Sequence, residues 1–95
     1  MRLRWTSEAG AQLRAIEAYI AQDSPAAARR TIIQLVRRAR QAGEFPHSGR
    51  QVPERRRDDL RELPEHPYRI IYRIRAEQID IVTIWHVRRL LPTGL

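Results

Sequence analysis

Residues 68–87 read YRIIYRIRAEQIDIVTIWHV, and this stretch decides the fold class of the 95-residue chain. In residues 68–74 tyrosine and isoleucine occupy every second position, and the positions between them carry two arginines and one isoleucine. This two-residue period is typical of a β-strand. Residues 76–78 are polar or small and indicate a short turn. Residues 79–87 carry apolar side chains on both faces, which is typical of a central, well-covered strand. The stretch therefore predicts two strands joined by a short turn, the second of which is central in its sheet.

Two shorter strands are predicted further towards the N-terminus. Residues 60–63, Leu-Arg-Glu-Leu, favour a short strand that Pro64 ends. Residues 2–5 alternate Arg, Leu, Arg, Trp and indicate a first strand. Between residues 44 and 53 the periodicity is lost, and prolines with a glycine indicate a loop, for which we expect Phe45 to be the anchor in the core.

Two amphipathic helices are predicted between the first strand and this loop. A threonine or serine at residues 6–7 caps the first helix, whose apolar residues recur at helical spacing until it ends near Gln22. Ser-Pro at residues 24–25 supplies a cap and a first-turn proline for the second helix, and Gly43 is its expected stop. So short a link between two amphipathic helices indicates an antiparallel hairpin.

The order of the predicted elements is β-α-α-β-β-β. Strands segregated from helices indicate an α+β fold, in which the helical hairpin packs on one face of a small antiparallel sheet. The length allows one hydrophobic core, so we expect residues 1–95 to form a single domain, with residues 91–95 as an irregular tail.

The positive charge of the chain is concentrated in one region. All 18 basic residues are arginines, and the formal net charge is +7. Residues 29–57 hold nine arginines against two acids, whereas the rest of the chain holds nine against nine. Arginine in place of lysine indicates either nucleic-acid binding or, as the favoured interpretation, a GC-rich genome, but a GC-rich genome does not explain this distribution. The asymmetry predicts an acidic or phosphate-bearing partner. Because no recognition-helix motif or interleaved aromatic residues accompany the arginines, an acidic protein is favoured over sequence-specific DNA binding.

Several classes of protein are disfavoured by what the sequence lacks. There are no cysteines, and the three histidines are scattered without the paired spacing of a metal site, so no metal or other cofactor is expected. No apolar signal region follows the first residues, and no apolar run approaches the ~20 residues that span a bilayer. We therefore expect a cytoplasmic protein that does not enter a membrane.

Six segments, taken in order, carry a resemblance to a known family. They are the first strand, SPAAA at 24–28, FPHSGR at 45–50, REL at 61–63, YRIIYRI at 68–74 and IWHVRR at 84–89. In this order and spacing they resemble the ParE-type toxins of the RelE/ParE superfamily, over about residues 2–90. The resemblance implies the toxin of a type II toxin–antitoxin system, held inactive by a cognate antitoxin. ParE-type members poison DNA gyrase, whereas RelE-type members cleave messenger RNA on the ribosome.

The favoured interpretation is a toxin that acts by binding DNA gyrase. His86, Arg88 and Arg89 close the last strand in the ParE manner and are the predicted target-binding residues. We expect the antitoxin to lay an amphipathic helix into an apolar groove along the hairpin, with its acids towards arginines. The arginines expected to border this groove are Arg29, Arg30 and Arg37.

The alternative is a metal-independent, ribosome-dependent messenger RNA endonuclease. Such chemistry needs a base, an acid and positive donors for the phosphate. Glu54 or His86 would move protons, and Arg69 and Arg73, expected to be exposed on one face of a strand, would hold the phosphate. Arg69 takes the place of a phosphate-binding arginine in the nuclease relatives. However, this chain lacks their lysines, and residues 91–95 lack their terminal Tyr or His. A ParE-like chain without toxic activity is the third alternative.

Overall fold

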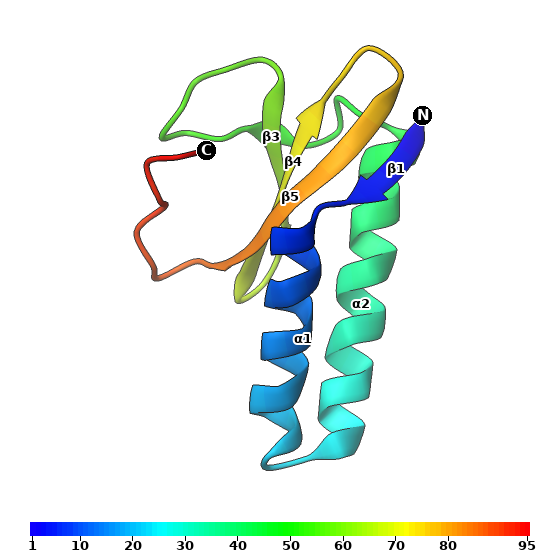
Figure 1. Cartoon of the computed structure of the whole chain (residues 1–95), viewed down its shortest axis with the longest axis vertical. Coiled ribbons are helices and arrows are strands. Elements are labelled where there is room, and N and C mark those ends of the chain that lie inside the picture. Colours follow the sequence, from blue (N-terminus) through cyan, green and yellow to red (C-terminus); the bar gives the residue numbers. More distant parts are fainter.

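Two helices and five strands make up the computed structural model, which describes all residues from 1 to 95. The elements are β1 (Arg2–Trp5), α1 (Ser7–Ala21), α2 (Pro25–Glu44), β2 (Arg50–Gln51), β3 (Leu60–Glu65), β4 (Tyr68–Ile74) and β5 (Gln78–His86). The helices form an antiparallel hairpin that packs on one face of the sheet (Figure 1). The predicted α+β architecture is therefore confirmed. No helix combines the length and the apolar character needed to cross a membrane.

Local capping signals set the two helix starts. The Thr6 hydroxyl accepts a hydrogen bond from the backbone N–H of Ala9 at 3.1 Å, and the Ser24 hydroxyl accepts one from Ala27 at 3.1 Å. Each bond satisfies an N–H that has no partner inside its helix. Because both signals act within a few residues, the sequence alone located these ends correctly.

The sheet has the strand order β1-β5-β4-β3-β2, so β5 lies inside the sheet, as predicted, with β4 beside it. It is mixed rather than purely antiparallel, because β1 runs parallel to its only neighbour, β5. Two helices separate β1 from the other strands, so no tight turn fixes its direction. The two-residue β2 is too short to produce a periodic signal and was not predicted. Pro64 lies within β3 rather than ending it, because β2 pairs only with Arg61 and Glu62 and leaves the edge at Pro64 free.

Apolar side chains gather on both faces of the sheet. The larger core lies between the sheet and the helices and includes Leu35, Tyr72 and Ile81. A second core lies on the opposite face, which is called the outer face below. Its members are Val52, Leu60, Ile71 and Trp85, with Val82, Leu91 and Leu95 packed against them. The C-terminal tail covers part of this outer face.

Phe45 is not the core anchor of the loop after α2, because it is 62% exposed. Tyr72 holds this loop instead. Its hydroxyl donates to the carbonyl of Pro46 at 2.7 Å and accepts from the N–H of Gly49 at 3.0 Å. The loop is thus fixed by polar contacts to β4, which a search for apolar anchors does not reveal.

Candidate functional site

A network of arginines and glutamates crosses the outer face of the sheet. At its centre, Arg69 donates from both terminal nitrogens to Glu54, at 2.8 Å each. Its Nε donates to Glu62 Oε1 at 2.7 Å, and the other oxygen of Glu62 accepts from Arg50 at 2.6 Å. Glu62 is only 4% exposed in its side chain. Two of the predicted nuclease residues, Arg69 and Glu54, are therefore brought together, but as partners in an ion pair.

Arg69 is not exposed, which corrects the expectation from the sequence. Its side chain is 11% exposed because the loop that carries Glu54 folds over β4. The hydrogen bonds from Arg69 lower the pKa of Glu54 from 4.5 to about 2. Glu54 is thus held firmly in its charged form, and the guanidinium that was expected to bind phosphate is already occupied by carboxylates.

Arg73 lies on the same face of β4, beside a second acidic group. Its Nε is buried without a hydrogen-bond partner and lies 3.9 Å from Asp59 Oδ2. Asp59 is itself bound by Arg57 at 2.8 Å. Arg73 therefore adds positive charge next to the network and is not bonded to either of its glutamates.

His86 lies away from the other predicted nuclease residues. Its ring packs edge-on against Tyr68, with 5.8 Å between the ring centroids. Tyr68 packs against the helix-side core, whereas Arg69, the next residue along β4, faces the opposite way. The His86 Nδ1 accepts a hydrogen bond from the backbone N–H of Arg88 at 3.1 Å. The sheet thus separates His86 from Arg69 and Glu54.

The predicted target-binding residues lie at the end of β5 but not on one face of the sheet: His86 packs against Tyr68 on the helix side, whereas Arg89 lies over Trp85 on the outer face. Arg88 and Arg89 follow His86 after Val87 and are exposed. The Arg89 guanidinium lies 4.0 Å from the centre of the Trp85 ring, in a cation–π contact. The indole N–H of Trp85 donates to the carbonyls of Arg89 and Leu90, at 3.3 and 3.2 Å. Leu90 is 95% exposed, and no sequence pattern distinguishes it from the other leucines. Only the backbone path of this turn shows that its side chain points outward.

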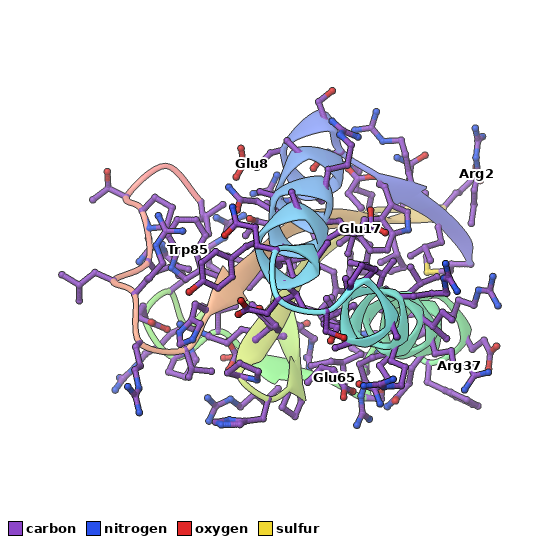
Figure 2. The ribbon with its side chains drawn as sticks, turned by 90° about the horizontal axis from the view of Figure 1, so that it is seen from below. Arg2, Glu8, Glu17, Arg37, Glu65 and Trp85 are labelled. Carbon is purple, nitrogen blue, oxygen red and sulfur yellow. The ribbon has the colours of Figure 1, made fainter.

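The basic surface of α2 lies on the other side of the molecule. Figure 2 shows Arg37 and Trp85 pointing to opposite sides. The three predicted antitoxin-binding arginines, Arg29, Arg30 and Arg37, are exposed on α2 and, like the exposed Arg40, form no ion pair within the chain. Their charge is therefore available to an acidic partner, and their role in antitoxin binding stays a prediction.

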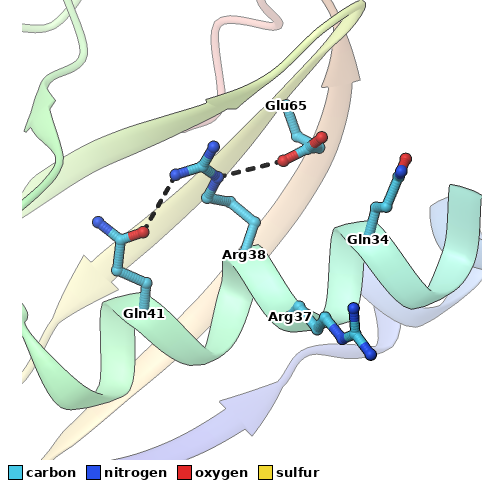
Figure 3. A pocket seen from close by; sticks show the side chains of 5 residues that line it. All are labelled: Gln34, Arg37, Arg38, Gln41 and Glu65. Carbon is cyan, nitrogen blue, oxygen red and sulfur yellow. Dashed lines mark hydrogen bonds and ion pairs between the residues drawn. The ribbon is translucent and has the colours of Figure 1, made fainter.

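The hollow beside Arg37 has a volume of about 280 Å³ and is entirely polar (Figure 3). Arg38 spans it, donating to Glu65 at 3.1 Å and to Gln41 at 3.1 Å, while Arg37 points away from this pair (Figure 3). Gln34 completes the lining. The apolar groove expected next to the arginines is therefore not found here, because long polar side chains occupy this flank of α2.

Comparison with known proteins gives a consistent result. Residues 3–91 match the family described as the ParE toxin of the type II toxin–antitoxin system, parDE. A relative from Caulobacter vibrioides, Toxin RelE2, is 40% identical over 87 residues, which cover 90% of this chain and 94% of the relative. A solved chain from the chromosomal ParDE toxin–antitoxin system of P. aeruginosa superposes with a TM-score of 0.76. It is 25% identical, and the match covers 90% of this chain and 95% of that one. Because the family match spans nearly the whole sequence, this chain belongs to the ParE family, the toxins of type II toxin–antitoxin pairs.

Proposed function

We propose that this toxin acts by binding DNA gyrase, with His86, Arg88 and Arg89 at the end of β5 in the contact surface. The observation that carries the proposal is the state of Arg69, which is neutralised by two glutamates instead of being free for a phosphate. A toxin that works by binding needs exposed, complementary side chains, and the end of β5 supplies them.

The nuclease alternative meets three physical obstacles. To hold a phosphate, Arg69 would have to give up charge-assisted hydrogen bonds and leave the buried Glu62 with Arg50 alone, at a cost of several kcal/mol. Glu54, with a pKa of about 2, is a weak base at neutral pH, where general bases work best with a pKa near 7. His86 lies across the sheet and does not reach either group.

A second candidate, cleavage of messenger RNA, is favoured by one observation, the name of the Caulobacter relative, Toxin RelE2. Family and fold are shared by toxins with different targets, so neither decides between the two activities. A growth assay distinguishes the third candidate, a ParE-like chain without toxic activity, from an active toxin. We expect that expression of this chain alone arrests bacterial growth and that the antitoxin gene restores it. Normal growth with folded, soluble protein would contradict an active toxin.

We also propose that acidic residues of the antitoxin approach Arg29, Arg30 and Arg37. These arginines have no acidic partner in the chain, and the net charge of +7 attracts an acidic protein over long range. The polar hollow on that side offers hydrogen bonds rather than apolar contacts, so we expect charge to dominate this part of the interface.

One pair of assays tests the target. Purified toxin should inhibit supercoiling by gyrase or trap cleaved DNA, while messenger RNA on translating ribosomes stays intact. Glu54→Ala should keep this activity, and neutralising both Arg88 and Arg89 should weaken it. Codon-specific cuts in messenger RNA that disappear in Glu54→Ala would overturn the proposal.

A further inference from the structure

We infer that Leu90 is the apolar anchor of the target-binding surface, and that residues 87–95, called the strap here, hold it in place. The inference rests on the proposed function, because it concerns the same surface at the end of β5. It assigns a role to an apolar side chain and to a residue far along the chain, Arg55.

Leu90 differs from the leucine that follows it. Its side chain is 95% exposed, whereas Leu91 packs against the outer core. Val87, three residues earlier, is 42% exposed. A single exposed leucine needs no explanation in a folded protein. This one stands in a short turn directly before Leu91, which packs on the outer core, and its backbone is held by hydrogen bonds.

Hydrogen bonds hold the turn that carries Leu90. The carbonyl of Leu90 accepts from the indole N–H of Trp85, which also bonds to the carbonyl of Arg89. The backbone N–H of Arg89 donates to the carbonyl of His86 at 3.1 Å, and that of Val87 donates to Pro67 at 2.9 Å. Trp85 itself is only 7% exposed, so these bonds start from a fixed point in the sheet.

Arg55 fastens the far end of the strap. The tail turns back along the outer face of the sheet and ends beside the loop that precedes β3 (Figure 1). There Arg55 donates from Nε to the carbonyl of Leu95 at 3.3 Å, and from a terminal nitrogen to the carbonyl of Pro92. Leu91 and Leu95 pack on the outer core between these points. A surface held in one conformation loses less conformational entropy on binding than a free tail would.

The chemistry of the surface indicates the chemistry of its partner. Arg88 and Arg89 lie between Val87 and Leu90 in the chain, and neither arginine has a carboxylate partner in the chain. The complementary site is an apolar pocket with acidic residues at its rim, on the protein that the toxin attacks. The basic surface proposed for the antitoxin lies on the opposite side, where Arg37 is seen in Figure 2. An acidic antitoxin bound to that basic surface therefore does not need to contact the strap.

The first test compares two exposed apolar residues. Leu90→Gln should raise the toxin concentration needed for half-inhibition of supercoiling about tenfold or more, because burial of a leucine contributes at least that much to binding. Ile33→Gln is the matched control, since Ile33 is 44% exposed on α2, and it should leave inhibition unchanged. Inhibition by Leu90→Gln at the wild-type concentration would overturn the inference.

The second test releases the strap while Leu90 stays in place. Arg55→Gln should make the hydrogen-bonded amides of residues 87–89 exchange faster and should weaken inhibition severalfold, whereas Arg55→Lys should restore part of both. Arg56→Gln is the control on the adjacent residue, whose side chain forms no hydrogen bond with the strap. Faster exchange in Arg55→Gln with unchanged inhibition would show that fastening does not matter for binding and would overturn this role of Arg55.

A photo-crosslinking amino acid at position 90 separates failure of the inference from failure of the proposed function. Crosslinking to a gyrase subunit in growing cells supports both. If Leu90→Gln relieves growth arrest but position 90 crosslinks to a ribosomal protein, the role of Leu90 in target binding is supported and the proposal that the target is gyrase is contradicted. Crosslinking only to the antitoxin or to a second copy of this chain would overturn the inference.

Discussion

Arg69 and Glu54 form a two-pronged ion pair, in which both terminal nitrogens of the arginine lie 2.8 Å from the two oxygens of the glutamate. This geometry is the strongest that a guanidinium and a carboxylate can adopt. It joins a loop to β4 on the outer face of the sheet, and it pairs two of the side chains that a nuclease would need with each other. The pair therefore has consequences for stability, pH dependence and activity.

The acid sensitivity of the fold should depend on Glu54. The pKa of this group is about 2 in the folded chain against an ordinary value of 4.5, so its stabilising effect is complete above about pH 4.5 and is lost as pH falls towards 2. Glu54→Gln should reduce stability at pH 7 by about 1 kcal/mol or less, because Glu54 is 40% exposed and screened, and the difference should vanish near pH 2. Urea unfolding over this pH range measures it. Glu77→Gln, at a residue without an ion pair, is the control, and an equal effect there would contradict the assignment.

Removing Arg69 should cost far more than removing Glu54. Arg69→Ala leaves Glu62, whose side chain is 4% exposed, with Arg50 as its only ion-pair partner, and we expect a loss of about 3 kcal/mol. Glu54→Ala removes the more exposed partner and should cost about 1 kcal/mol or less. Chemical denaturation at pH 7 gives both values. Equal losses would show that Glu62 does not depend on Arg69. Growth assays with Arg69→Ala require this measurement as a folding control.

The loop after α2 should loosen when the hydroxyl of Tyr72 is removed. Tyr72→Phe leaves the carbonyl of Pro46 and the N–H of Gly49 without their partner, which should cost about 2 kcal/mol. Gly49→Ala should also destabilise, since its Cβ would lie 2.5 Å from the Tyr72 hydroxyl and 2.6 Å from the carbonyl of Glu62. The second contact is with backbone, so Tyr72→Phe should not rescue Gly49→Ala. A double variant as stable as Tyr72→Phe alone would contradict this account.

Association with the antitoxin should depend on where positive charge is removed. Neutralising Arg29, Arg30 and Arg37 together should lower the association rate constant about tenfold at low salt, because exposed charges steer the encounter of the two proteins. The salt dependence of the rate constant should also fall, since fewer charges remain for salt to screen; the Debye length is about 8 Å at physiological ionic strength. A variant in which three other exposed, unpaired arginines are neutralised has the same net charge and should lose less. These control positions are Arg2, Arg14 and Arg56. Stopped-flow kinetics with purified antitoxin compares the two, and equal rates would indicate steering by net charge alone.

The sequence by itself determined the elements whose signals are local. Caps at Thr6 and Ser24 act within three residues, and the alternation along residues 68–74 reports directly which side chains share a face. Adjacent elements with short connections then leave few possible arrangements, so the helical hairpin on a sheet could be predicted. The joint order of several short motifs was enough to indicate the family.

Only the tertiary structure decided what covers each face and which charges meet. Alternation places Arg69 and Arg73 on the same face of β4 and predicts that this face is open to water, whereas the Arg69 side chain is only 11% exposed. The loop with Glu54 and the strap, both without periodicity, fold back over it and turn the arginine into a partner of two glutamates. The parallel direction of β1 and the separation of His86 from Arg69 by the sheet also depend on how distant segments of the chain pair with one another. A periodic pattern records which side of its own element a residue takes, whereas the pairing of charges depends on segments distant in the chain.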